Sequence, residues 1–153
     1  MNHFLFYLSD WISSVFRVGY LPLAPGTWGS LFALLVWWFL PPDISNFTYI
    51  LIILNLFLIG VITSSIISYK VKENDPSKVV IDEWVGMWIT LIGVPKIFGW
   101  MVLSFVLFRF FDITKIFPAH RLEKIRGGWG IMLDDIVAGI YALLIFQGIY
   151  HLV

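Results

Sequence analysis

The chain has 153 residues, of which 59% are hydrophobic and only 13% are charged, and its mean hydropathy is +0.88. A soluble domain of this length could neither bury nor expose so much apolar surface, so we expect an all-α membrane protein with a single domain over residues 1–153. The formal net charge of zero argues against a nucleic-acid partner, and the absence of cysteine excludes disulfides and thiol chemistry.

The chain begins with two segments that are not full membrane spans. Residues Phe4–Tyr20 mix aromatic and polar side chains, which predicts an amphipathic helix lying on the membrane surface or against the bundle. Leu21–Ser30 is too rich in proline and glycine for a helix interior, and Thr27 or Ser30 is placed to cap the apolar run Trp28–Leu40. That run would rise only about 20 Å as a helix, so we expect it to be tilted, buried in the bundle or partly re-entrant.

Four longer apolar runs follow, separated by polar loops and one turn. They cover Phe47–Ser68, Val79–Val94, Phe98–Phe111 and Ile131–Tyr150. Phe47–Ser68 would measure about 33 Å as a helix, which is enough to cross the hydrocarbon core. The pattern predicts a polytopic helical bundle with about four crossings, embedded in a bilayer. It leaves the oligomeric state open.

Positive charges are distributed unevenly over the predicted loops. The crossings place the loops around Thr27, Lys70 and Lys115 on one side, and nine of the ten Lys and Arg residues belong to that side. Lys96 alone lies opposite. Because the cytoplasmic loops of membrane proteins carry an excess of Lys and Arg, we expect this side to face the cytoplasm.

The strongest functional signal is a pair of adjacent acids at the start of each of two predicted helices. Asp82 and Glu83 form one pair, and Asp134 and Asp135 form the other. At helical spacing, small residues lie below both pairs: Gly86, Thr90 and Gly93 in one helix, Ala138, Gly139 and Ala142 in the other. An Asp at mid-bilayer costs about 2.5–3.5 kcal/mol, so acids kept there are functional candidates. The alternative is that they only complement the dipoles of their own helices.

Both pairs come to the predicted cytoplasmic side, where Asp112 ends a third helix. Carboxylates gathered in one pocket repel one another unless a cation binds between them. The candidate ligands are all oxygens, which predicts a hard ion, Mg²⁺. The predicted metal ligands are Asp82, Glu83, Asp134 and Asp135. Asp112 is expected to bind the ion as well or to orient the residues that do.

Basic residues near these acids suit a bound phosphate group. The candidates are Arg109, Lys115 and Arg121, although positive charge in this region also serves topology. The glycine-rich stretch around Thr27 is suited to present backbone N–H groups to a phosphate, or simply to cap the next helix. A small cation or proton transporter is the alternative from a different class, since intramembrane acids also line ion paths. Against it, the acids all lie at one end of the predicted bundle.

Four ordered motifs between Gly19 and Gly139 carry a family resemblance. They are Ala24-Pro-Gly-Thr-Trp-Gly-Ser30, Val79-Val-Ile-Asp82-Glu83-Trp-Val-Gly86, Phe108-Arg-Phe-Phe-Asp112-Ile-Thr-Lys115 and Gly130-Ile-Met-Leu-Asp134-Asp135-Ile-Val-Ala-Gly139. Together they resemble the phosphatidylglycerophosphatase A family. One departure is visible, because the family often has Lys-Pro where this chain has Lys115-Ile116.

The resemblance implies a Mg²⁺-dependent bacterial phosphatase that converts phosphatidylglycerophosphate to phosphatidylglycerol. It would be a multi-pass protein of the inner (cytoplasmic) membrane with its active site facing the cytoplasm. On this interpretation the catalytic residues are Asp82, Glu83, Asp112, Lys115, Asp134 and Asp135. The residues expected to bind the lipid substrate are Thr27, Arg109, Lys115 and Arg121. Direct attack by water and transfer through a carboxylate both stay open.

Two other enzyme classes that act on lipids lack their signatures in this chain. Phosphatidyl transferases that use a nucleotide-activated lipid carry Asp-Gly-x-x-Ala-Arg, and phosphohistidine lipid phosphatases carry Ser-Gly-His. Neither motif occurs in the sequence. Phosphatidylglycerophosphatase is therefore the interpretation that the residues favour.

Overall fold

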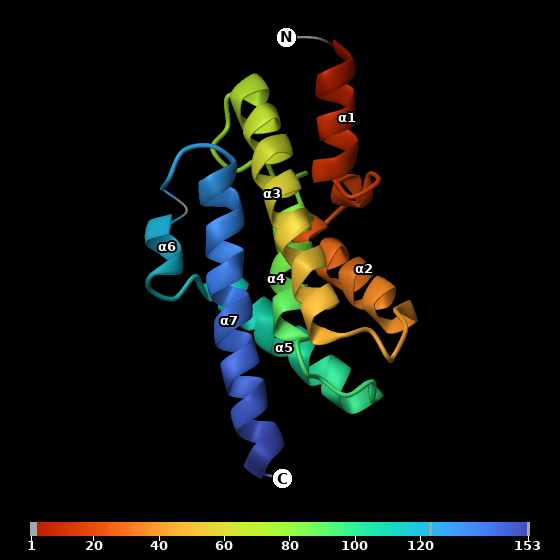
Figure 1. The fold of residues 1–153 in the computed structure, drawn as a ribbon. Helices are drawn as coiled ribbons and strands as arrows, with labels where there is room; N and C mark the ends of the chain where they lie inside the picture. The colour runs from red at the N-terminus through yellow and green to blue at the C-terminus, as the bar shows by residue number, and fades with distance from the viewer. Residues whose placement is uncertain (1–2, 123, 153) are drawn as a thin grey trace.

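The computed structural model describes residues 3–122 and 124–152, and every regular element within them is helical (Figure 1). The elements are α1 (His3–Ser13), the 3₁₀ turn η1 (Val18–Tyr20), α2 (Pro25–Phe39), α3 (Asn46–Val71), α4 (Ile81–Thr90), α5 (Phe98–Thr114), α6 (Ala119–Leu122) and α7 (Gly128–Leu152). The all-helical prediction is confirmed for this part of the chain.

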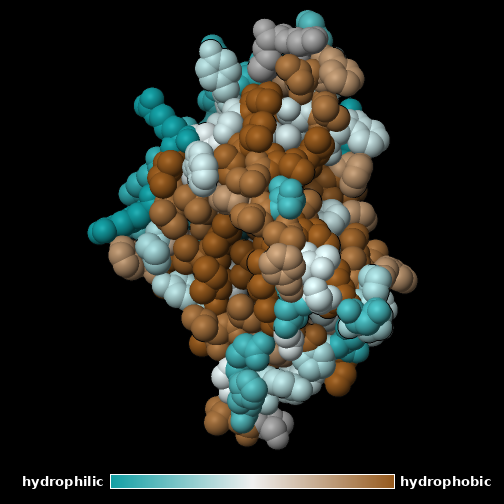
Figure 2. All heavy atoms as spheres, in the orientation of Figure 1, coloured by the Kyte–Doolittle hydropathy of each residue, from teal (hydrophilic) through white to brown (hydrophobic). Residues whose placement is uncertain are grey.

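Among the described helices, α3 and α7 are the two that are long and apolar enough to cross a membrane. They contain 26 and 25 residues, and the first turns of α7 pack against the middle of α3 (Figure 1). Only 33% of the most apolar window of α3 is buried inside the protein, so most of its apolar surface is left for another apolar phase. Figure 2 shows this face of the molecule covered largely by hydrophobic side chains. The fold therefore suggests a membrane protein.

The predicted count of about four crossings is not established by these helices. The run predicted over Val79–Val94 forms a helix of ten residues, α4, which rises only about 15 Å. It ends at Thr90 because Gly93 adopts a left-handed conformation with φ of 72° and Pro95 follows. α2 and α5, with 15 and 17 residues, rise about 22 and 25 Å.

α4 lies at the centre of the bundle, in contact with α2, α3, α5 and α7. Its closest approach is to α7, at Gly86 and Gly139. A Cβ atom added to Gly139 would lie 2.4 Å from the Gly86 carbonyl oxygen, so only glycine allows the two backbones to come this close. The Thr90 hydroxyl donates a hydrogen bond to the Gly139 carbonyl oxygen at 3.3 Å. The two stripes of small residues that the sequence predicts on these helices therefore face each other.

The two ends of the bundle are held by different contacts. At one end, α1 packs against α3 and leaves Phe4, Tyr7, Leu8 and Trp11 exposed (Figure 1). Of the two predicted placements for this segment, the structure shows packing against the bundle. At the other end, the Lys96 ammonium donates hydrogen bonds to the carbonyl oxygens of Trp38 and Leu40 and so caps the end of α2.

Candidate active site

Four helix ends meet around one pocket of about 270 Å³. The start of α2, the start of α4, the end of α5 and the first turns of α7 form its walls, together with the loop between α3 and α4. Its lining residues are Ala24, Pro25, Gly26, Asp75, Ser77, Val79, Asp82, Glu83, Arg109, Asp112, Ile113, Lys115, Asp134 and Asp135. All five acids named from the sequence line this single pocket.

Three of these acids lie close enough to share one ion. Asp82 and Glu83 on α4 and Asp135 on α7 each offer a carboxylate oxygen, and these oxygens all lie within 4.8 Å of one another. Asp82 is 7% exposed and Asp135 only 3%. The backbone contact between Gly86 and Gly139, one helical turn below, brings the two acidic turns together.

Several oxygens in the pocket have no partner in the described part of the chain. The buried atoms Asp82 Oδ1, Glu83 Oε2 and Asp134 Oδ1 accept no hydrogen bond there. A buried carboxylate without a partner is costly, and adjacent carboxylates add mutual repulsion. A divalent cation would relieve both costs, and a set of donors made only of oxygens fits a hard ion such as Mg²⁺.

Two cations complete the pocket. Arg109 Nη1 pairs with Asp112 Oδ2 at 2.5 Å and donates a hydrogen bond to the Ser30 hydroxyl at 3.3 Å. Lys115 Nζ pairs with Asp134 Oδ2 at 2.9 Å. Asp134, predicted as a metal ligand, thus lies in the pocket but is paired with lysine, outside the group formed by the other three acids. The arrangement places two positive side chains beside the carboxylates, where a phosphate could contact both.

The start of α2 reaches this pocket through a glycine. A Cβ atom on Gly26 would lie 2.0 Å from Glu83 Oε1 and 3.1 Å from Arg109 Nη1, so a larger residue would displace both side chains. Thr27 itself is not among the residues that line the pocket. Its backbone N–H already donates to the Ala24 carbonyl oxygen at 3.0 Å, because α2 begins at Pro25, earlier than predicted.

Arg121, predicted to bind substrate, also lies outside the pocket lining. It is exposed on α6, and its guanidinium lies over the Phe117 ring at 4.9 Å from the centroid. Conversely, the pocket includes Asp75, which is not among the acids predicted from the sequence. The sequence feature that could have suggested Asp75 is its position seven residues before Asp82, in the loop that leads into α4.

Below the pocket, the helices do not continue the series of charged side chains. Between Glu83 and Lys96 there is no Asp, Glu, Lys or Arg, and none follows Asp135 in α7. An ion path would need further polar groups along these helices. This distribution favours a site at one end of the bundle over a transport route.

Comparison with known proteins agrees with this chemistry. The profile of the family described as "Phosphatidylglycerophosphatase A" matches residues 11–150. A Haemophilus influenzae protein and an Escherichia coli protein, both named phosphatidylglycerophosphatase A, are 35% and 37% identical to the chain. The matches cover 89% of this chain in both cases, and 85% and 80% of the relatives.

A third relative carries a different substrate in its name. A Bacteroides thetaiotaomicron protein named "Putative phosphatidylinositol-3-phosphatase" is 36% identical over 140 residues, covering 88% of each chain. No solved structure gave a significant match. All three relatives are thus named as phosphatases of a phospholipid, two for phosphatidylglycerophosphate and one for a phosphatidylinositol phosphate.

Proposed function

The chain belongs to the phosphatidylglycerophosphatase A family, and we propose that it hydrolyses the terminal phosphate monoester of phosphatidylglycerophosphate to give phosphatidylglycerol and inorganic phosphate. It is an enzyme of the phosphoric monoester hydrolase class. The observation that carries the proposal is the pocket itself, in which unpartnered carboxylate oxygens lie beside Arg109 and Lys115. That combination suits a metal ion and a phosphate bound side by side.

We assign the chain's own groups as follows. Asp82, Glu83 and Asp135 would hold Mg²⁺, which supplies positive charge at the phosphoryl oxygens when bound. Asp112 and Asp134 orient Arg109 and Lys115 through their ion pairs.

The two cations would then contact the remaining phosphoryl oxygens. Their charge stabilises the negative charge that spreads over these oxygens as the bond to the leaving group loosens. Because Lys115 is already paired with Asp134, it is held near the pocket before any substrate arrives.

The test is phosphate release from a purified, detergent-solubilised protein. We expect release from phosphatidylglycerophosphate in the presence of Mg²⁺, and loss of that activity with a chelator. Phosphatidylinositol 3-phosphate, offered in the same micelles, tests the substrate that the name of the Bacteroides relative gives. A higher kcat/KM for the inositol lipid would overturn the choice of headgroup, and full activity in chelator would overturn the metal assignment.

We further propose that the pocket faces the cytoplasm in a bacterial inner membrane. Support comes from the Lys and Arg distribution and from the long apolar helices α3 and α7. The natural chain has no cysteine, so single cysteines at the exposed positions Ser77, Arg126 and Asn46 can be labelled without a background. The first two should react only with a reagent that reaches the cytoplasm, and the third only from outside. Equal labelling of Ser77 and Asn46 from one side would refute this topology.

A further inference from the structure

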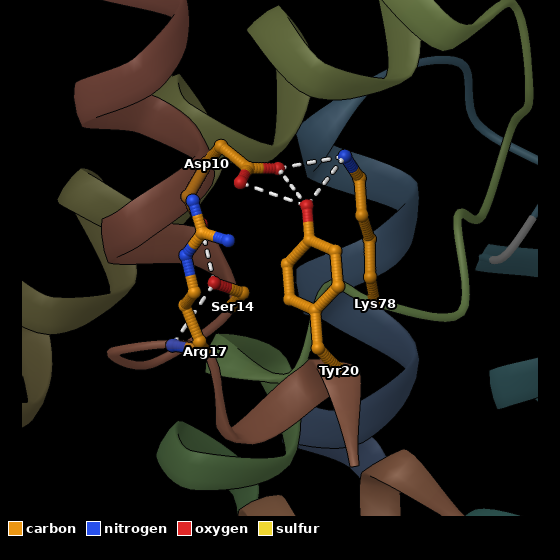
Figure 3. Close-up of polar contacts among 5 residues, drawn as sticks. All are labelled: Asp10, Ser14, Arg17, Tyr20 and Lys78. Atoms are coloured by element: carbon orange, nitrogen blue, oxygen red, sulfur yellow. Dashed lines mark hydrogen bonds and ion pairs between the residues drawn. The ribbon is translucent and has the colours of Figure 1, made fainter. Parts of the chain in front are cut away.

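One buried carboxylate, that of Asp10, lies on α1 and outside the pocket (Figure 3). Asp10 is 4% exposed, and the Tyr20 hydroxyl, which lies 2.8 Å from both of its carboxylate oxygens, donates its one proton to the carboxylate. The Lys78 ammonium pairs with Asp10 Oδ1 at 2.6 Å and also donates to the Tyr20 hydroxyl at 3.2 Å. We call Asp10, Tyr20 and Lys78 the α1 clamp. None of the three lines the pocket.

Lys78 belongs to the short segment 77–80, which leads from the loop after α3 directly into α4. Ser77 and Lys78 form a turn, in which the Val79 N–H donates to the Pro76 carbonyl oxygen at 2.9 Å. Ser77 and Val79 line the pocket, whereas the Lys78 side chain contacts Asp10. One side of the segment therefore forms a wall of the candidate active site while the other side is held by α1.

Backbone contacts hold the same segment. The Val80 N–H donates to the Ser13 carbonyl oxygen at 2.9 Å, which ties the residue before α4 to the end of α1. Gly19 packs directly on the Lys78 carbonyl, since a Cβ atom at Gly19 would lie 2.0 Å from that oxygen. The first residues of α4 therefore start from a position that α1 and η1 determine.

The turn between α1 and η1 is itself conformationally unusual. Val15, Phe16 and Arg17 have φ angles of 50°, 52° and 70°, a left-handed conformation that non-glycine residues rarely adopt in succession. Such a turn persists only where surrounding contacts over-determine it. The Ser14 hydroxyl contributes by donating to the Asp10 carbonyl oxygen and accepting from the Arg17 N–H (Figure 3).

We propose that the α1 clamp is a positioning device for the candidate active site, which sets the start of α4 so that Asp82 and Glu83 meet Asp135. This proposal rests on the function proposed above. Lys78 lies four residues before Asp82, and the three acids must stay within a few ångströms of one another to share an ion. Loss of the clamp would leave the pocket residues present but misplaced.

The experiment compares Lys78→Met, Asp10→Asn and Tyr20→Phe with the natural chain. Because misplacement by about 1 Å can cost about 100-fold in rate, we expect kcat to fall about 10- to 100-fold for Lys78→Met, with KM for the lipid changed less than about twofold. The Mg²⁺ concentration for half-maximal activity should rise. Tyr20→Phe removes only a hydroxyl and should fold. Its kcat should fall, and its Mg²⁺ concentration for half-maximal activity should rise, by less than in Lys78→Met.

Lys96→Met is the matched control, because Lys96 also ties two segments through its ammonium but at the opposite end of the bundle. It should lower Tm without changing kcat or the Mg²⁺ requirement. In the double variant Asp10→Asn/Lys78→Met, the loss of kcat should be no larger than in the worse single variant, since the two groups act as one. Additive losses would contradict a shared device.

Hydrogen exchange provides a measurement that needs neither substrate nor metal. Amide exchange over residues 79–84 should accelerate in Lys78→Met and stay unchanged in Lys96→Met. If Tm falls in Lys78→Met while kcat, the Mg²⁺ requirement and this local exchange match those of Lys96→Met, the clamp is only a structural tie. If the natural chain releases no phosphate from the lipid, the proposed function fails, and faster local exchange would still support positioning.

Discussion

Asp10 and the acids of the pocket lie on opposite sides of segment 77–80, and they differ in how the chain compensates their negative charge. Asp10 is fully paired within the chain, by the Tyr20 hydroxyl and the Lys78 ammonium. In the pocket, Asp82 and Glu83 each retain a buried oxygen that accepts no hydrogen bond from the described residues. Both groups are buried, so burial alone does not separate a structural acid from a functional one.

This contrast indicates that the pocket acids, unlike Asp10, need a bound ligand to compensate their charge. Burying a charge costs several kcal/mol, and the cost is offset only by a well-placed partner. The partners of Asp10 are side chains of the same chain. Removing the charge of Asp10 or of Lys78 therefore leaves the other charge without its partner. In the pocket the fold supplies two cations for six carboxylates, an excess of negative charge that the proposed metal ion would offset.

The most direct test of this difference is to neutralise one acid of each kind, Asp135 in the pocket and Asp10 on α1. Asp135→Asn should lower phosphate release by at least about 100-fold through loss of a metal ligand. The melting temperature of the metal-free protein should stay equal or rise, because charge repulsion is relieved. Asp10→Asn should lower Tm by roughly 3–6 °C, as expected for losing about 1–2 kcal/mol of paired interaction in a domain of this size.

Asp43→Asn serves as the control for both variants, because Asp43 lies outside the pocket and the α1 clamp. It should change neither activity nor Tm. An Asp135→Asn protein that keeps full, Mg²⁺-responsive activity would remove the metal assignment. A drop in metal-free Tm for Asp135→Asn equal to that for Asp10→Asn would erase the distinction between the two groups.

A second variant breaks the pocket without touching any charge. Gly139→Ala places a methyl group against the Gly86 carbonyl and should push α7 away from α4. We expect a loss of about 1–3 kcal/mol in unfolding free energy and a fall in kcat of about 10- to 100-fold, measured by thermal unfolding and phosphate release. Gly148→Ala, on the same helix with open space at the added atom, should be nearly neutral. Equal effects at the two positions would contradict the packing argument.

A third variant tests whether the cation paired with Asp134 acts on the substrate. Lys115→Ala should lower kcat by about tenfold or more with a smaller change in KM, because the contact strengthens as the phosphoryl charge spreads. Lys115→Arg should recover only part of the rate, since a planar guanidinium does not replace a compact ammonium. Lys124→Ala, an exposed lysine outside the pocket, is the matched control. Normal turnover in Lys115→Ala would refute the role.

The smallest expected effect concerns the pH dependence of the α1 clamp. Burial alone would lower the pKa of the Lys78 ammonium, but the hydrogen bonds accepted by Asp10 and Tyr20 outweigh burial and raise this pKa overall. A raised folded-state pKa adds stability below the unfolded value of about 10.4, and the gain is lost as pH rises through the folded value. The Tm difference between the natural chain and Lys78→Met should therefore stay constant from about pH 6 to 9 and shrink above about pH 10.5. Lys70→Met, at an exposed lysine, should show no such difference.

Much of the class and chemistry of this protein could be predicted from residue order alone. Apolar runs of helical length predicted the helices, because a chain with 59% hydrophobic residues has few other ways to satisfy its backbone. The acid pairs above small residues predicted where the pocket would form. Those features are local, and helical periodicity of 100° per residue is enough to place them on one face.

The sequence could not decide which side chains of distant segments come into contact. Asp134 and Asp135 are neighbours, yet one pairs with Lys115 and the other joins Asp82 and Glu83. A single residue step turns a side chain by about 100°, so the rotation of α7 against α4 makes that choice. Asp10 meets Lys78 across 68 residues, and Asp75 reaches the pocket from a loop. Such pairings depend on how whole helices pack, and no local pattern carries that information.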